Sequence, residues 1–167
     1  MGLRIVLLSD WHSEKMGYSD NVLPKALAAL GHEVHLLSSN GQVYFNSREY
    51  RRTFEPFLGP GVVECGIWNI DGYTLHRLPY KEWWGRIGIR GLRSALNRLR
   101  PQIVQAGELV SLVTLEAALS RRPRSYKLFA ECHIHASVFP PALRPGGGQA
   151  LYWRLYSATV GRLIGAA

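Results

Sequence analysis

The sequence predicts an α/β protein with an open, doubly wound parallel sheet, and its first forty residues carry much of the evidence. Residues 3–9 form a nearly continuous apolar run, which is typical of a strand covered on both faces. Residues 20–30 then have apolar side chains at helical spacing, and Gly31 follows as a helix terminator. A second apolar strand occupies residues 33–37. Strand, helix and strand in this order predict a βαβ unit with a right-handed crossover.

The remaining elements continue this alternation, and each has its own local signal. Pro24 fits the first helix if Asp20 or Asn21 caps it, because the ring then lies within or just beyond the first turn. Asp71-Gly72 is a two-residue hairpin signal. Strands and helices joined by short loops favour the doubly wound parallel sheet. The expected elements are a short helix within 47–57, strands at 66–70 and 73–78, a helix at 87–100, a strand at 102–106, a helix at 109–119, a strand at 127–132 and a helix at 149–167.

Length and composition limit the class of protein. The chain has 167 residues, of which 47% are hydrophobic and 19% are charged, and it has only two cysteines. These values exclude a disordered chain and a disulfide scaffold, and the length suits one domain spanning residues 1–167. The first apolar run is too short for a signal peptide, and no stretch is long enough to span a bilayer. We therefore expect a cytoplasmic protein.

The loop after the first strand is the first candidate binding site, since ligands of such sheets bind beyond the carboxyl ends of the strands. It ends at a helix N-terminus, where free N–H groups favour an anion, and Gly17 would let a phosphate approach the backbone. We predict that Gly17, Tyr18 and Ser19 bind the phosphate groups of a substrate. A plain loop with a glycine before a helix is the alternative. Neither a dinucleotide fingerprint nor a P-loop is present, so NAD, FAD and ordinary P-loop chemistry are disfavoured.

The loops after two later strands offer further candidates. Glu108 could bind substrate hydroxyls, or it could cap the helix that follows. His133, at the end of the strand at 127–132, could bond a substrate hydroxyl or phosphate, or a nearby backbone group. A metal site would use His133, His135 and Cys132, with His12 as an optional further ligand, but no further ligand spacing supports it. We therefore predict no bound metal.

A basic, tryptophan-bearing segment forms the last signal. Trp83, Trp84 and Arg86 precede an arginine-rich helical pattern, and the whole chain has 20 Lys and Arg against 12 Asp and Glu, a net charge of +8. Such a surface suits a membrane interface, where it would add a peripheral contact at the inner face, or an apolar acceptor with anionic groups. A solvated helix face with tryptophans packed beneath it is the alternative. Nucleic-acid binding would rest on charge alone, so no specific nucleic acid is expected.

Three stretches of this sequence together resemble the family 4 glycosyltransferases of the GT-B fold. The run RIVLLSDWHSEKMGYSDNVLPKALAALGHEVHLLSSN resembles the opening of that family, with its apolar strand, glycine loop and helix ending in Leu-Gly-His-Glu-Val. RPQIVQAGE resembles the fourth strand of the family, and KLFAECH resembles the fifth strand ending in histidine. The resemblance covers essentially the whole chain in order. It implies the Rossmann-like, N-terminal, acceptor-side domain of a two-domain enzyme.

The resemblance also implies roles for individual residues. Gly17 would face the diphosphate of a nucleotide-sugar donor, and His133, the catalytic candidate, would reach the transferred sugar or the acceptor. Met16 stands where the family usually has the first glycine of a pair. Members retain anomeric configuration and generally need no metal, so no cofactor is expected besides the nucleotide-sugar substrate. The partners implied are that donor and a sugar or lipid-linked acceptor.

The resemblance covers only one of the two domains of these enzymes. The donor-binding C-terminal domain, with its pair of glutamates, has no counterpart in these 167 residues. We therefore expect a hexosyltransferase-type enzyme in a longer parent, and no activity from this chain alone. The alternative is a non-catalytic Rossmann-like module that binds an anionic metabolite or a partner protein.

Overall fold

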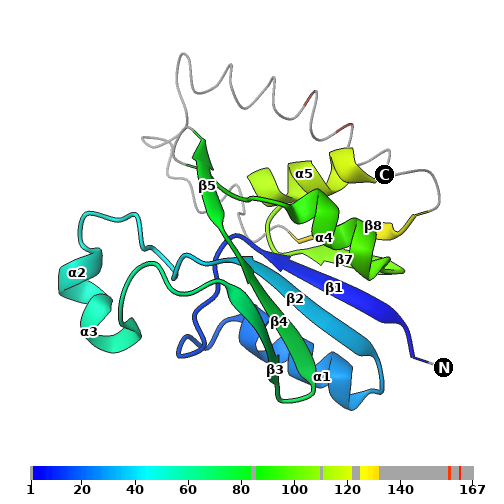
Figure 1. Ribbon diagram of the computed structural model, residues 1–167, viewed down its shortest axis with the longest axis horizontal. Helices are drawn as coiled ribbons and strands as arrows, with labels where there is room; N and C mark the ends of the chain where they lie inside the picture. The colour runs from blue at the N-terminus through cyan, green and yellow to red at the C-terminus, as the bar shows by residue number, and fades with distance from the viewer. Residues whose placement is uncertain are drawn as a thin grey trace, which may run out of the picture.

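A six-stranded, mostly parallel β-sheet forms the centre of the protein (Figure 1). The computed structural model describes residues 2–83, 86–109, 111–121 and 125–131, together with 158 and 162. The strand order is β3-β4-β2-β1-β7-β8, and only β3 runs antiparallel to its neighbour. The strands are β1 (Arg4–Ser9), β2 (Glu33–Ser39), β3 (Gly66–Ile70), β4 (Tyr73–Leu78), β7 (Ile103–Ala106) and β8 (Lys127–Ala130).

Helices pack on both faces of the sheet, since successive residues of a strand point to opposite faces. Helix α1 packs with Ile5, Leu7 and Leu36, whereas α4 and α5 pack with Val6, Leu8 and other residues of the opposite set. Figure 1 accordingly shows α1 on one side of the sheet and α4 and α5 on the other. The helices are α1 (Ser19–Ala29), α2 (Tyr50–Thr53), α3 (Glu55–Leu58), α4 (Leu92–Leu99) and α5 (Leu112–Ser120).

The central strands are buried because both of their faces are covered. Val6, Leu36, Leu75 and Val104 have no measurable exposure, which explains why these strands read as continuous apolar runs. The predicted β1, α1, β2 and β3–β4 hairpin are all present within a residue or two. The predicted α/β class is therefore confirmed, with a mixed rather than a fully parallel sheet.

Helix α1 ends as its sequence predicts but begins differently. Gly31 has a φ of +83°, and the N–H groups of Gly31 and His32 bond the carbonyls of Ala28 and Leu27, which is a Schellman motif. At the other end, Tyr18 is the N-cap residue and provides no side-chain cap. The expectation of a cap from Asp20 or Asn21 is therefore wrong, and Pro24 lies in the second turn. Helix α1 therefore begins at Ser19, directly after the loop that follows β1.

The helix expected at residues 87–100 is only partly correct. Its second half is α4, but its first half is β6 (Arg86–Ile89), which pairs antiparallel with β5 (Tyr80–Trp83). Ile87 and Ile89 are both buried, so their spacing fits an alternating strand as well as a helix. Gly91, with a φ of +79°, separates the strand from the helix. The helix expected at 149–167 lies outside the described residues apart from 158 and 162.

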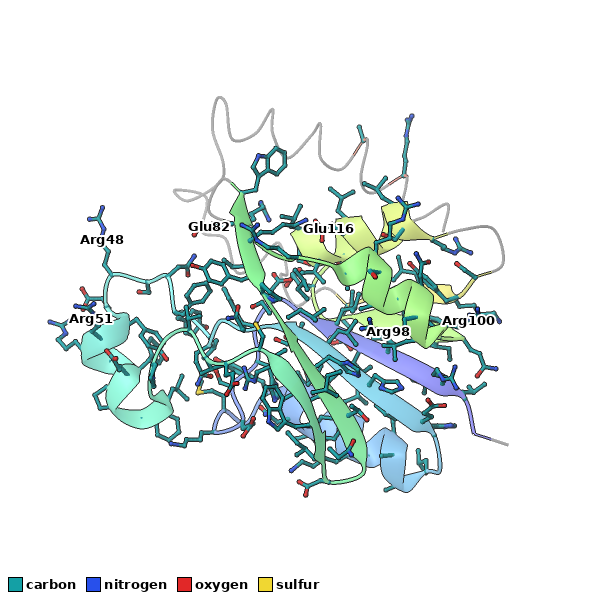
Figure 2. The ribbon with its side chains drawn as sticks, viewed as in Figure 1. Arg48, Arg51, Glu82, Arg98, Arg100 and Glu116 are labelled. Carbon is teal, nitrogen blue, oxygen red and sulfur yellow. The ribbon has the colours of Figure 1, made fainter. Side chains whose placement is uncertain are left out.

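Basic side chains of the described residues lie on more than one side of the molecule. Figure 2 shows Arg48 and Arg51 beside α2, on the opposite side of the molecule from Arg98 and Arg100 at the end of α4. Among the described residues, no helix is long and apolar enough to cross a membrane.

Candidate functional site

A pocket of about 540 Å³ lies at the carboxyl ends of β1 and β7, where it is lined by residues of both strands and of the loops that follow. From β1 the chain continues outward to β2 and β4, whereas from β7 it continues to β8 on the other side. The strand order thus reverses between β1 and β7, and this is where ligands of open parallel sheets usually bind. The geometry makes this pocket the candidate site.

The loop predicted to bind phosphate forms one wall of this pocket. Gly17, Tyr18 and Ser19 all line it, together with Glu108 from the loop after β7. No heavy atom lies within 4 Å of where a Cβ would stand on Gly17, and Gly17 is exposed at the pocket. A ligand could therefore approach the backbone there. The structure brings these four predicted residues together at one site.

Four carboxylates dominate the charge of the pocket. Asp10, Asp20, Glu108 and Glu131 line it, and none of its described lining residues is Lys, Arg or His. Within the described part of the chain, no group of His, Cys, Asp and Glu is arranged to hold a metal ion. Cys132, His133 and His135, which the metal alternative would need, lie outside the described residues. The site is thus acidic in a chain of net charge +8.

Asp10 lies directly after β1, and its surroundings change its protonation. Burial raises the pKa of Asp10 to about 7, and the nearby Glu108 carboxylate acts in the same direction. A hydrogen bond from Ser111 and the charge of Arg86 lower the pKa in part. Near neutral pH, Asp10 therefore exists in both protonation states and can either accept or donate a hydrogen bond.

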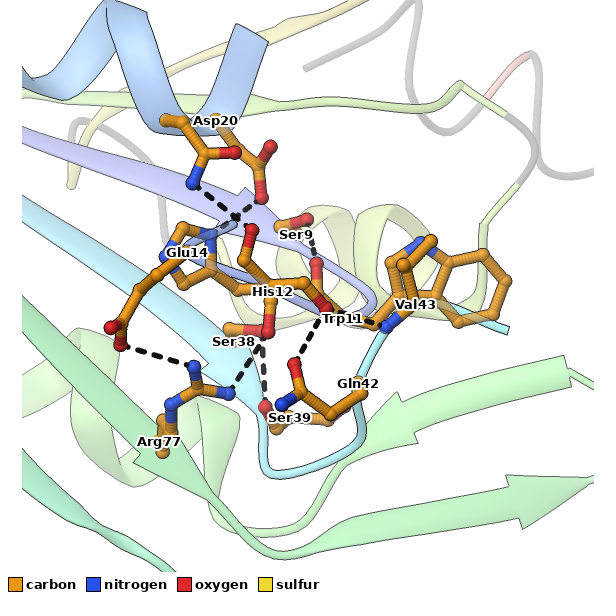
Figure 3. Close-up of polar contacts among 12 residues, drawn as sticks. Ser9, Trp11, His12, Glu14, Asp20, Ser38, Ser39, Gln42, Val43 and Arg77 are labelled. Atoms are coloured by element: carbon orange, nitrogen blue, oxygen red, sulfur yellow. Dashed lines mark hydrogen bonds and ion pairs between the residues drawn. The ribbon is translucent and has the colours of Figure 1, made fainter. Parts of the chain in front are cut away.

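The loop that carries Asp10 is held in place by buried polar contacts (Figure 3). His12 is fully buried, and its Nδ1 lies 2.7 Å from Asp20 Oδ2 at the start of α1. The His12 carbonyl accepts a bond of 3.0 Å from the buried Arg77 guanidinium of β4. The Ser13 hydroxyl donates to Gln42 Oε1 and accepts from the Val43 N–H. These bonds tie the loop to α1, to β4 and to the segment after β2.

Aromatic rings form part of the lining of the pocket. Trp11, Tyr18 and Tyr44 line it, and the ring centroids of Trp11 and Tyr44 are 5.7 Å apart. A hydrogen bond between the side chains of Tyr18 and Tyr44 raises the pKa of Tyr18. Tyr44 has a φ of +60°, an uncommon conformation for a residue with a Cβ, and its ring also packs on Phe54. The Tyr44 ring thus lines the pocket from a strained backbone conformation.

The structure distinguishes between the two roles considered for Glu108. Ser111 is the N-cap of α5, because its hydroxyl oxygen accepts the Thr114 N–H at 3.0 Å. Glu108 contributes only its backbone carbonyl, which accepts a bond from the Thr114 hydroxyl. Its Oε1 atom is buried and has no hydrogen-bond partner among the described residues. The capping role therefore belongs to Ser111, and the Glu108 carboxylate remains available to a ligand.

Trp83 and Arg86, the described residues of the predicted acceptor surface, do not line this pocket. Trp83 is 58% exposed on β5 and does not line the pocket, whereas Arg86 on β6 is close enough to influence Asp10. Trp84 lies outside the described residues, as does His133, the predicted catalytic residue. The β5–β6 hairpin is attached to the domain by an ion pair between Lys81 and Glu116 of α5.

Several residues of the pocket were not predicted from the sequence. Asp10 and Glu131 each follow a parallel strand directly, so the rule about carboxyl strand ends could have identified them. Tyr44 had no such signal, because it comes from an irregular segment after β2 and reaches the site only through tertiary packing. Comparisons with protein-family models and with curated proteins gave no match to this chain.

Proposed function

We propose that this chain is the acceptor-side, N-terminal domain of a retaining glycosyltransferase that uses a nucleotide-sugar donor. The observation that carries the proposal is the pocket at the strand reversal between β1 and β7, lined by both the glycine loop and Glu108. In a doubly wound, Rossmann-like half of a GT-B enzyme, this edge of the sheet would face the donor-binding domain. The strand order and the helices on both sides support that assignment.

The roles of the residues follow from their positions. Gly17 lies at the exposed rim before α1, where backbone N–H groups would stabilise the negative charge that builds on the departing diphosphate. Glu108 would hold acceptor hydroxyls, and His133 would position the transferred sugar. Trp83, Trp84 and Arg86 would recruit a lipid-linked or anionic part of the acceptor at the inner face of the membrane.

The alternative is a non-catalytic module. The acidic lining weighs against an anionic metabolite held in the interior of the pocket, because Asp10 and Glu108 would repel one there. A partner protein would need a surface other than this recessed pocket. The enzyme assignment therefore accounts for more of the site.

The change Gly17→Val tests the diphosphate contact. Because a side chain here meets no other atom and the backbone needs no left-handed φ, the variant should melt at the same temperature as the wild type. In a protein that joins this chain to its donor-binding domain, kcat/KM for the nucleotide-sugar should fall at least about tenfold. An unchanged kcat/KM would show that no phosphate approaches Gly17.

A further inference from the structure

The charge inside the pocket is opposite to that of the whole chain. The chain carries +8, but the ionisable side chains lining the pocket that are charged near neutral pH are all carboxylates among the described residues. A ligand in a recessed pocket experiences the nearby charges strongly and the distant surface charges weakly, because solvent screens the latter. A phosphate or carboxylate inside the pocket would therefore be repelled.

Three of the four carboxylates already have a partner within the protein. Asp20 contacts His12, and Glu131 accepts a hydrogen bond from the Gln105 amide. Glu108 Oε1, in contrast, is buried without a partner among the described residues. Asp10 accepts from Ser111, which leaves further acceptor capacity on its two oxygens. A buried acceptor without a donor is costly, so Glu108 favours a ligand that brings a hydrogen-bond donor, and Asp10 can accept a second hydrogen bond.

The rest of the pocket suits a ring with an apolar face. Tyr18 and Tyr44 are 41% and 42% exposed, and the half-buried Leu23 also lines the pocket. Aromatic and aliphatic surfaces bind C–H groups, whereas the carboxylates bind hydroxyl or ammonium groups. A pyranose ring presents both kinds of surface.

We propose that the pocket interior binds a sugar ring with hydroxyl or ammonium donors and no negative charge, and that Asp10 and Glu108 are the residues that select it. Identifying this ring as the acceptor sugar rests on the proposed function. The donor diphosphate then lies at the exposed Gly17 edge of the pocket rather than in its interior, and any anionic or lipid part of the acceptor lies outside the pocket. The acidic pocket thus selects a ring without negative charge. The β5–β6 hairpin, which carries Trp83 and Arg86, would contact the rest of the acceptor.

Direct binding to the chain tests this proposal. The probes are methyl pyranosides, the corresponding amino sugars and the 6-phosphates of the same sugars, titrated by calorimetry or by NMR shifts. The uncharged or amino forms should bind at least about tenfold more tightly than the phosphates. The ratio between the first two distinguishes hydroxyl from ammonium donors. Equal or tighter binding of the phosphates, or no binding of any pyranoside, would overturn the proposal.

Two isosteric variants test the residues. Glu108→Gln and Asp10→Asn keep the shape of the side chain and remove its charge, so each should reduce the discrimination against the 6-phosphate at least about threefold. Glu49→Gln is the matched control, since Glu49 is an exposed carboxylate paired with Arg52 outside the pocket. Wild-type discrimination in both folded variants would show that these carboxylates do not select the ligand.

The proposal and the function on which it rests fail in different ways. Charge-selective binding of a pyranoside by this chain, without transfer by the protein that contains both domains, would contradict the enzyme assignment alone. Transfer to an acceptor whose reacting ring carries a phosphate would contradict the charge selection alone.

Discussion

The carboxyl group of Asp10 changes its proton affinity when the chain folds. Its ordinary pKa is 3.8, and in the folded protein burial raises the pKa to about 7. Between these two values the folded state binds more protons than the unfolded state. The free energy of unfolding that depends on Asp10 is therefore highest below about pH 4 and falls as the pH rises to about 7.

His76 on β4 acts in the opposite direction over much of the same range. Burial, the neighbouring His35 and Arg98 lower the pKa of His76 from 6.5 to about 4, and its ring lies 3.1 Å from the His35 ring nitrogen. Here the unfolded state binds more protons, so this contribution to stability is lost as the pH falls from about 6.5 to about 4. The two effects partly cancel in the wild type, so a variant is needed to separate them.

Asp10→Asn should show the contribution of Asp10. Relative to the wild type, the variant should gain about 2 kcal/mol in free energy of unfolding between about pH 4 and pH 7.5. This gain in free energy is smaller than the whole pKa shift of Asp10 would correspond to. Asp10 is partly exposed, so solvent screens part of the effect. Urea unfolding at several pH values measures the difference, in which the unchanged His76 term cancels. A difference that stays constant with pH would contradict the raised pKa.

At the scale of single elements, α5 depends on the residue that caps its N-terminus. Ser111→Ala removes the hydroxyl that caps the Thr114 N–H, and we expect a loss of about 1 kcal/mol. The same change removes the hydrogen bond that lowers the pKa of Asp10, so the pH-dependent fall in stability should extend to higher pH. Denaturant unfolding checks both effects.

Ser120→Ala is the matched control for that experiment, because Ser120 is the last residue of the same helix. It should leave stability and pH dependence almost unchanged. Equal losses in the two variants would mean that the Ser111 cap has no special role.

The elements also show which parts of the secondary structure local sequence patterns can predict. β1, α1 and β2 were predictable because apolar runs and Gly31 specify them locally. The β5–β6 hairpin was not, because Ile87 and Ile89 fit both a helical and an alternating period with the apolar residues that follow. The strand packs closely against α5 at Gly88, because a Cβ at this position would lie 2.9 Å from the Leu112 side chain. Such close packing leaves no signal in a single sequence.

The candidate site was predictable to a similar degree. The rule that ligands bind at carboxyl strand ends selected the loops of Gly17 and Glu108, and both line the pocket. Tyr44 and the acidic character of the pocket were not predicted, because they arise when segments distant in sequence come together. Net charge pointed to anionic partners, whereas the local charge of the pocket indicates the opposite for its interior.

At the scale of the whole molecule, the proposed membrane contact depends on the exposed hairpin rather than on total charge. Arg48 and Arg51 lie on the opposite side of the molecule from Arg98 and Arg100, so these four arginines do not form one basic surface (Figure 2). Trp83→Ala should therefore lower binding to vesicles of phosphatidylcholine and phosphatidylglycerol about three- to tenfold. Co-sedimentation at constant ionic strength measures this effect.

Trp68→Ala is the control for that variant. Trp68 is also an exposed tryptophan on a strand, with 38% exposure against 58% for Trp83, but it lies on β3 at the edge of the main sheet. It should leave vesicle binding unchanged. Equal effects of the two changes would mean that the hairpin is not the membrane-facing surface.

The central claim is that this chain is the acceptor-side half of a nucleotide-sugar glycosyltransferase. The most direct measurement incubates the protein that joins this chain to its donor-binding domain with a panel of labelled UDP- and GDP-sugars and uncharged acceptor sugars. We predict release of the nucleoside diphosphate from at least one donor and a glycoside that retains the anomeric configuration of that donor. Neither transfer nor donor hydrolysis with any member of the panel would contradict the claim.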